Sequence, residues 1–188
     1  MLEPKIIFED EDFIAINKPV GMMVHGVKIS SSKKLKNLNQ STLVDWLIKR
    51  HPELKKVGDD TDNRPGIVHR LDKDTSGIIL IPKTQKYFLY LKSLFQNHKI
   101  KKTYLAIVFG IPKLKEGTID KPIGIKDGTI KRSVYSTKHL KEAITKYKIL
   151  KSINISSLEK KITLNSELDS LSLLEVTPQT GRTHQIRV

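Results

Sequence analysis

The chain has 188 residues, of which 38% are hydrophobic and 29% charged, a balance typical of a globular protein and not of a disordered chain. Its length predicts one domain, residues 1–188, with a real core. The formal net charge of +14 favours a polyanionic partner, nucleic acid first and an anionic membrane surface second, although a Lys-rich surface without a partner gives the same charge. The absence of cysteine excludes disulfides, thiolate catalysis and zinc sites built on Cys.

Membrane insertion and secretion are not expected. No apolar run approaches the roughly 20 residues of a membrane helix. The N-terminus lacks the apolar segment of a signal peptide. The absence of cysteine also fits a cytoplasmic protein, and with nothing in the sequence that suggests more than a monomer, we predict a cytoplasmic, monomeric protein without a membrane partner.

The first third of the chain predicts short strands and one helix. The expected elements are strands at 5–8, 13–17 and 22–25, a flexible loop at 28–40, a helix from the Ser41-Thr42 cap to about His51, and a polar loop at 52–64. Residues Lys18 to Gly21 break the strand pattern with Pro and Gly, and the loop is rich in Ser, Lys and Asn.

The remaining two thirds predict one long helix among many strands. The helix is expected at 84–97, and the strands at 67–69, 77–81, 99–109, 118–119, 132–136, 143–150, 162–164 and 172–177. Phe88, Leu91 and Phe95 recur at helical spacing. Strands with few helices between them predict an α+β fold, a mostly antiparallel mixed sheet with a few flanking helices.

The most informative segment runs from His69 to Gly77, His-Arg-Leu-Asp-Lys-Asp-Thr-Ser-Gly, followed by the apolar run Ile-Ile-Leu-Ile. Arg70 and Asp72 are two residues apart and share a face in extended backbone, where the guanidinium would hold the carboxylate ionised. Such a carboxylate suits a nucleophile or a general base. Asp74 is expected to be a solvated loop residue, and His69 to pack.

Arginine is used sparingly, which marks the places where it occurs. Only six of the 34 basic residues are Arg, and three of the six, Arg70, Arg182 and Arg187, lie in two short segments. A chain that otherwise uses Lys for charge needs the planar guanidinium at these places.

The second segment, Thr180-Gly-Arg-Thr-His-Gln-Ile-Arg187, reads as a turn followed by the start of a helix. Arg182 and Ile186 would then share a helix face, which suits a pocket for a flat polar ring and an anion. An ordinary amphipathic helix start explains the pattern equally well.

Lys102 and Tyr104 share a face of the strand expected at 99–109. The Tyr ring could stack on a base and Lys102 could bind a phosphate. A core Tyr is the better explanation for a lone Tyr on a strand.

Metal and cofactor sites are not expected. His25, His51, His98 and His139 lack metal-ligand spacing with an acidic or Cys set, and phosphate-loop and dinucleotide patterns are absent.

At these residues the chain resembles the RluA-type RNA pseudouridine synthases. The resemblance rests on five motifs in order: Lys18-Pro19-x-Gly21 with His25, the His69–Gly77 segment, Lys102-x-Tyr104 with Leu105-Ala106, Glu142-Ala143-x-Thr145, and Thr180–Arg187. It covers almost the whole chain and implies the pseudouridine synthase catalytic fold.

The resemblance implies roles for individual residues. Asp72 matches the catalytic aspartate, Tyr104 the active-site tyrosine, and Arg182 the arginine that pairs with the catalytic aspartate. Arg70 would fill the space of a flipped base or hold a phosphate. Lys102, Ile186 and Arg187 are the other expected substrate-binding residues.

The reaction that the resemblance implies is isomerisation of specific uridines to pseudouridine in structured RNA, ribosomal RNA or transfer RNA, without metal or cofactor. The uridine is flipped out, and Asp72 either attacks it or removes a ribose proton. Family members continue past the last motif, so we expect the C-terminal part of the fold to be missing here. Some also carry an RNA-binding domain ahead of the catalytic one, so we expect substrate choice to lie in this domain.

Three other functions are weighed against this one. An aspartyl-phosphate phosphatase needs a strand directly before its Asp and a downstream acidic pair. A kinase needs a Gly-rich loop and an Asp-Phe-Gly segment. Neither set is present. An inactive or truncated RNA-binding protein that keeps the fold is the serious alternative.

Overall fold

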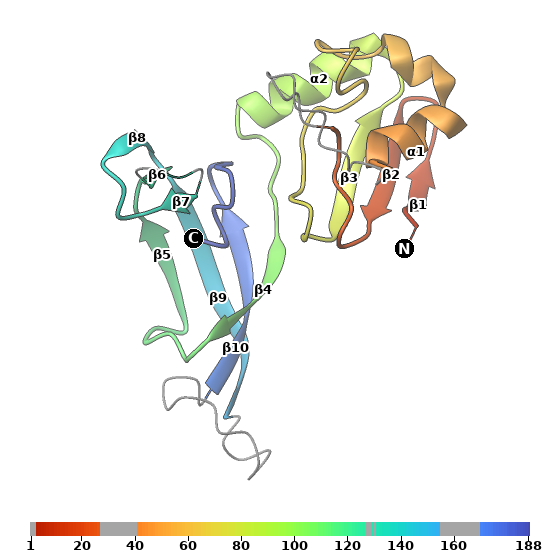
Figure 1. The fold of residues 1–188 in the computed structure, drawn as a ribbon. Coiled ribbons are helices and arrows are strands. Elements are labelled where there is room, and N and C mark those ends of the chain that lie inside the picture. Colours follow the sequence, from red (N-terminus) through yellow and green to blue (C-terminus); the bar gives the residue numbers. More distant parts are fainter. Residues whose placement is uncertain (1–2, 27–40, 127–128, 130, 155–169) are drawn as a thin grey trace. The chain divides into compact units, whose positions relative to one another are not determined.

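The computed structural model describes residues 3–26, 41–126, 129, 131–154 and 170–188. Internal contacts divide the chain into two compact units, Met1–Lys99 and Ile100–Val188, called unit 1 and unit 2 here. Each has its own sheet and is described by itself (Figure 1). The loop expected at 28–40 and the strand expected at 162–164 lie outside the described residues, and the single domain expected from the length stays a prediction.

Unit 1 consists of a small sheet with helices. Its elements are β1 (Lys5–Glu9), β2 (Phe13–Lys18), α1 (Leu43–Arg50), the 3₁₀ helix η1 (Pro52–Lys56), β3 (Gly77–Pro82) and α2 (Gln85–Gln96). The strands pair antiparallel in the order β1-β2-β3. Asp10 closes the first turn, because its Oδ1 accepts hydrogen bonds from the backbone N–H groups of Asp12 and Phe13.

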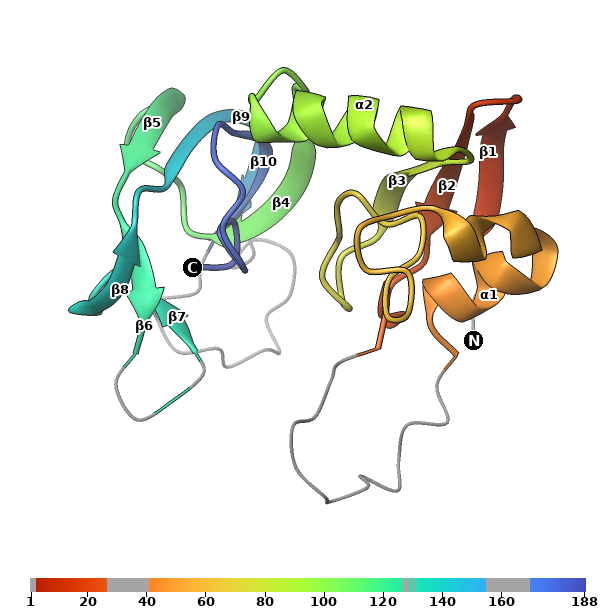
Figure 2. The ribbon, with the colours of Figure 1, turned by 90° about the horizontal axis from the view of Figure 1, so that it is seen from above.

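The core of unit 1 lies against one face of this sheet. Alternate residues of β2 and β3 are fully buried, and so are residues of each helix: Ile14, Ile16, Ile79 and Ile81 from the strands, and Leu43, Leu47, Leu54 and Phe88 from the helices. Figure 2 shows both helices beside the three strands. The period of two along the strands and of about four along α1 explains why these positions are the apolar ones.

Both helices begin and end within a residue of the positions that the sequence predicts. Thr42 caps α1 in a capping box, in which its hydroxyl accepts from the Asp45 N–H while the Asp45 carboxylate accepts from the Thr42 N–H. Thr84 caps α2 by accepting from the Tyr87 N–H, and Asn97 ends it. Cap chemistry therefore fixes these boundaries.

Two strands expected in unit 1 do not form. Residues 22–25 are irregular because the carbonyls of Met23 and Val24 accept from the first N–H groups of α1 and are not available to a strand partner. Residues 67–69 are irregular as well, and the side chain of His69 accepts the Leu80 N–H of β3 at 3.0 Å. The polar loop expected at 52–64 begins with the 3₁₀ helix η1.

Unit 2 is built from strands. Its elements are β4 (Tyr104–Phe109), β5 (Glu116–Asp120), β6 (Ile123–Ile125), β7 (Arg132–Ser133), β8 (Lys138–Lys141), β9 (Ile144–Asn154) and β10 (Ser170–Pro178). The larger sheet has the order β4-β10-β9-β5, and a small sheet has the order β7-β6-β8. All the pairings between described strands are antiparallel, so the expected α+β class is confirmed.

The larger sheet buries one face. Ser172, Leu174 and Val176 of β10 are buried, whereas Leu105 and Ile107 of the edge strand β4 are exposed. The Ser172 hydroxyl donates to the Gly110 carbonyl at 2.8 Å, which satisfies the buried hydroxyl at the end of β4.

Several expectations for unit 2 need correction. The strand expected at 99–109 begins only at Tyr104, so Lys102 precedes the strand. The strand expected at 132–136 shrinks to β7, and the short strands β6 and β8 were missed. Strands of two to four residues carry too few alternating positions for a periodicity to show.

Among the described residues, no helix combines the length and the apolar character that crossing a bilayer requires.

Candidate functional site

Asp72 lies in a tight turn that leads into β3. The Thr75 N–H donates to the Asp72 carbonyl at 3.1 Å, which closes the turn. Leu71, directly before it, is buried, and Asp72 itself is half-buried. The carboxylate is thus presented on irregular backbone that a buried residue holds at one end and a buried strand at the other.

The side chain of Lys18 holds the backbone of this turn in place. Its side chain is fully buried, and Nζ donates to the carbonyls of Pro19 and Met22, both at 2.8 Å, and of Lys73 at 3.2 Å. The Gly21 N–H donates to the same Lys73 carbonyl at 2.9 Å. The Lys-Pro-x-Gly segment therefore fixes the backbone of the residue next to Asp72.

The charge of Lys18 is sensitive to its surroundings. Burial lowers its pKa below the usual 10.5, while the negative charges of Asp74 and Asp72 act in the opposite direction. A buried ammonium is expensive unless its donors are satisfied, and three carbonyls meet that need here.

The neighbours of Asp72 take different positions. His69 packs, with its ring stacked on Phe95 at 4.4 Å between centroids, which agrees with the structural role expected for it. Asp74 and Arg70 are exposed. The pairing of the Arg70 guanidinium with the Asp72 carboxylate stays a prediction.

In unit 2, Gln185 holds the turn that carries Arg182. Its Oε1 accepts from the Arg182 N–H at 2.8 Å and from the Thr180 hydroxyl at 2.9 Å. Its Nε2 donates to the Ile144 carbonyl at 3.1 Å and to the Thr145 hydroxyl at 2.9 Å. The turn is thus fastened to the first residues of β9.

The guanidinium of Arg182 is oriented by the residues just before the same strand. Its Nε donates to the carbonyl of Glu142, two residues before β9, at 2.7 Å. The motif Glu142-Ala143-x-Thr145 and the Thr180–Arg187 segment, far apart in sequence, therefore form one arrangement within unit 2. Arg182 is half-buried, and its position is set by backbone as well as by side-chain contacts.

The helix expected at the C-terminus is not formed among the described residues. Hydrogen-bonded turns replace it, and His184 has a φ of 59°, in the left-handed region that interrupts a right-handed helix. The argument that Arg182 and Ile186 share a helix face is therefore wrong. Ile186 is half-buried and Arg187 exposed, and both stay candidates for substrate contact.

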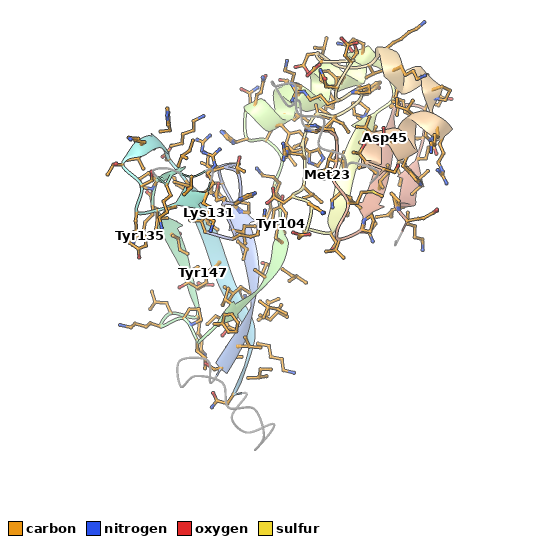
Figure 3. All side chains as sticks on the ribbon, in the orientation of Figure 1. Met23, Asp45, Tyr104, Lys131, Tyr135 and Tyr147 are labelled. Atoms are coloured by element: carbon orange, nitrogen blue, oxygen red, sulfur yellow. The ribbon has the colours of Figure 1, made fainter. Side chains whose placement is uncertain are left out.

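Lys102 and Tyr104 lie at the beginning of β4. Tyr104 is the first residue of the strand, half-buried and opposite Val176 of β10 (Figure 3). Lys102 precedes the strand, and burial lowers its pKa from 10.5. A Cβ placed on Gly181 would lie 3.8 Å from the Lys102 Nζ, so this lysine reaches the turn before Arg182.

The described residues contain no group of three or more His, Asp or Glu side chains that could hold a metal ion.

Lys18 and Gln185 stand in two of the five motifs, but their positioning role was not predicted from the sequence, although each carried a signal for it. Lys18 follows Ile14 and Ile16 at a spacing of two, so its parity on β2 already put it on the buried face. Gln185 stands three residues after Arg182 and reaches back to its N–H, the spacing of the glutamine in a capping box.

Comparisons with known proteins agree with this arrangement of motifs. Residues 12–188 match the model of the RNA pseudouridylate synthase family. The ribosomal large subunit pseudouridine synthase D of Zymomonas mobilis is 36% identical over 185 residues, which are 98% of this chain and 50% of that protein. The ribosomal large subunit pseudouridine synthase C of Rickettsia bellii is 34% identical over 184 residues, 97% of this chain and 51% of that protein. The chain thus spans about half the length of these curated relatives.

Solved structures show the same fold. Human RNA pseudouridylate synthase domain containing 1 superposes with a TM-score of 0.71 at 22% identity, covering 99% of this chain and 63% of that one. Human RNA pseudouridylate synthase domain containing 4 superposes with a TM-score of 0.65 at 25% identity, covering 97% and 62%. With the family model matching nearly its whole length, the chain belongs to the RNA pseudouridylate synthase family, and its motifs are those of the RluA type.

Proposed function

We propose that this protein isomerises uridine to pseudouridine within RNA, with Asp72 as the residue that acts on the nucleotide. The observation that carries the proposal is the anchored backbone beside Asp72: this residue stands in a turn whose next carbonyl, that of Lys73, accepts from the buried Lys18 ammonium. A carboxylate carried on backbone held in this way suits attack or proton removal, in a chain whose family carries out this reaction.

The reaction breaks one bond and forms another without a change of oxidation state. The N1–C1′ bond of the uridine breaks, the uracil turns over, and a C5–C1′ bond forms. The proton on C5 is then lost, and N1 gains one. Atoms and charge balance within the nucleotide, so the protein has to supply only a nucleophile or base, a proton path and a binding surface.

Tyr104 and Arg182 are the residues of unit 2 that we propose for the same reaction. The Tyr104 ring can pack on the uracil, and its phenol can take part in the late proton transfer. Arg182 supplies a fixed positive charge. Arg70, Lys102, Ile186 and Arg187 complete the proposed substrate-binding set.

The nucleotide must leave its stack before chemistry can begin, and this costs a few kcal/mol, least in loops and unpaired regions. The net charge of +14 offsets that cost by phosphate contact and counterion release. Relatives named as ribosomal large subunit synthases favour large-subunit ribosomal RNA as the substrate, with transfer RNA as the comparison substrate. A cytoplasmic location and a monomeric state stay predictions.

The test is pseudouridine content, measured by nucleoside chromatography after incubation of the chain with unmodified ribosomal and transfer RNA transcripts. We expect product from the wild type. Asp72→Asn removes the charge with almost no change in shape and should abolish turnover, a loss of at least about 10²–10⁴-fold, while RNA binding is kept.

Asp74→Asn is the matched control, because it makes the same chemical change at an exposed position two residues away. Its turnover should equal that of the wild type. An inactive Asp74→Asn beside an active Asp72→Asn would exchange the two assignments. Salt-dependent RNA binding by the wild type without any product would instead support a protein that only binds RNA.

A further inference from the structure

The side chain of His69 joins the segment that carries Asp72 to the edge of the sheet in unit 1. β3 is the last strand in the order β1-β2-β3, so every second N–H group of β3 points away from β2. One of these, the N–H of Leu80, donates to the Nε2 of His69 at 3.0 Å. The imidazole therefore takes the place that a backbone carbonyl of a further strand would occupy.

The same ring is also held by α2. It stacks on Phe95 of that helix, with 4.4 Å between the ring centroids and 24° between the ring planes. α2 lies beside β3 in both views (Figures 1 and 2). The hydrogen bond acts in the plane of the imidazole and the stacking acts on its face, so the two contacts together fix the position and the orientation of the ring.

The hydrogen bond also defines the chemical state of His69. A ring nitrogen that accepts carries a lone pair, so the imidazole is neutral and its proton lies on Nδ1. A phenylalanine at this position would stack on Phe95 as well, but it could not accept the N–H of Leu80. Packing alone therefore does not require a histidine here, whereas the hydrogen bond requires an acceptor.

Asp72 lies between this contact and the one made by Lys18. His69 stands three residues before Asp72, and the carbonyl of Lys73, one residue after it, accepts from the Lys18 Nζ at 3.2 Å. Leu71, between His69 and Asp72, is buried. A short stretch of chain that is held before and after Asp72 leaves the backbone of this residue little freedom, which is what a reacting group needs.

We propose that His69 is a positioning residue for Asp72. As the acceptor of the Leu80 N–H, its neutral imidazole holds the chain that enters the turn against β3 and so sets where the Asp72 carboxylate stands. The inference rests on the proposed function for the role of Asp72, and it gives His69 a part in the reaction beyond packing.

Three substitutions separate the hydrogen bond from the stacking. His69→Phe keeps a ring on Phe95 and removes the acceptor. His69→Gln removes the ring and keeps an acceptor, because the glutamine Oε1 lies as many bonds from Cβ as the imidazole Nε2. Phe95→Leu removes the stacking partner and leaves the acceptor in place. The kcat and the KM for pseudouridine formation are measured for each variant on an unmodified large-subunit ribosomal RNA transcript.

The expected result is a loss in kcat that follows the acceptor. His69→Phe should lower kcat by about 10- to 100-fold and leave KM within about twofold, because RNA still binds while Asp72 is held less well. His69→Gln and Phe95→Leu should keep kcat within about fivefold of the wild type. His98→Gln, at an exposed histidine of the same unit, is the control and should equal the wild type. Equal losses in His69→Phe and His69→Gln, or a larger loss in Phe95→Leu than in His69→Phe, would overturn the inference.

Nuclear magnetic resonance reads the hydrogen bond in the wild type, so the test does not depend on whether a variant folds. The His69 Nε2 should have the ¹⁵N chemical shift of an unprotonated ring nitrogen in a long-range ¹H–¹⁵N spectrum. The Leu80 amide should exchange about tenfold faster in His69→Phe than in the wild type. A protonated Nε2 in the wild type would overturn the inference by itself.

Turnover by the wild type keeps this inference apart from the proposed function. If the wild type forms pseudouridine and His69→Phe keeps the wild-type kcat, the inference is wrong and the proposed function stands. If the wild type forms no pseudouridine, the proposed function is wrong, and the positioning role of His69 is overturned with it even where the hydrogen bond is confirmed.

Discussion

The turn that carries Asp72 and the turn that carries Arg182 are both irregular backbone, and in each a single long side chain reaches several groups at once. In unit 1 the side chain is Lys18, a buried ammonium that donates to three carbonyls. In unit 2 it is Gln185, a neutral amide that accepts two hydrogen bonds and donates two. The two solutions differ in charge, and their physical consequences differ accordingly.

A buried ammonium makes stronger hydrogen bonds than an amide, but its desolvation is costly and its protonation depends on pH. It also adds positive potential near Asp72 and Asp74, which an amide does not. Gln185 can both donate and accept, so it closes its network without any charge. The comparison indicates that the stability of the Asp72 turn depends on the protonation of Lys18, whereas the stability of the Arg182 turn does not depend on the protonation of Gln185.

Removal of the Lys18 ammonium tests the first half of this comparison, and we expect it to have the largest effect on stability. Lys18→Met keeps the length and the apolar stem but leaves the carbonyls of Pro19, Met22 and Lys73 without this donor. We expect a loss of about 3 kcal/mol in the free energy of unfolding, because buried acceptors that lose a charged donor bear the desolvation cost.

Trp46 reports this loss selectively. It is the one tryptophan of the chain and lies on α1 in unit 1, so the urea midpoint of its fluorescence follows unit 1. Lys55→Met, at an exposed lysine of η1, is the control and should leave the midpoint in place. If both variants unfolded at the wild-type midpoint, Lys18 would not anchor the turn.

Removal of the Gln185 amide tests the other half of the comparison. Gln185→Leu keeps the volume and deletes all four hydrogen bonds, so we expect the Arg182 turn to loosen by about 2 kcal/mol and its amides to exchange about 30-fold faster. The kcat for pseudouridine formation should fall by up to about 10²-fold, because Arg182 is no longer held in place.

Hydrogen exchange and Trp46 fluorescence together decide this prediction. The Trp46 midpoint should not move, since the four hydrogen bonds that the variant deletes all join Gln185 to residues of unit 2. Gln179→Leu, at an exposed glutamine of the same unit, is the control and should leave both exchange and kcat unchanged. Slow exchange of the Arg182 amide in Gln185→Leu would show that backbone alone holds the turn.

Elements whose signal is local could be predicted from the sequence. Thr42 and Thr84 cap their helices where expected, because a cap needs only a hydroxyl and the next turn of helix. β2 and β3 were found from the alternation around Ile14 and the apolar run after Gly77. Capping and periodicity act within a few residues, so a single sequence contains them.

The expectations that were wrong depend on partners distant in sequence. Residues 22–25 have a strand-like pattern, yet their carbonyls are taken by the first turn of α1. The helix expected after Arg182 is interrupted at His184, and the turn there is held by Ile144 and Thr145 of β9. The motifs named Asp72, Tyr104 and Arg182 as candidates, but the hydrogen bonds were needed to show that Lys18 and Gln185 hold the two turns.

The pH dependence of stability gives the smallest and most discriminating difference between the two anchors. Burial lowers the pKa of Lys18 below 10.5 in the folded chain, whereas the unfolded chain keeps the ordinary value. Between these two pKa values the unfolded chain holds more protons, so the free energy of unfolding gains a contribution that rises with pH up to about 10.5. Asp74 and Asp72 oppose the shift and keep the contribution small.

The stability difference between the wild type and Lys18→Met, followed through Trp46, should therefore widen as the pH rises from neutral. Titrating groups that are far from Lys18 cancel in that difference because both chains contain them. The corresponding difference for Gln185→Leu, followed by the equilibrium unfolding of unit 2, should stay flat, because no proton is bound or released at a glutamine. A Lys18→Met difference that is equally flat would show that the buried ammonium keeps its charge as a surface lysine does, and the two anchors would then differ in chemistry but not in their response to pH.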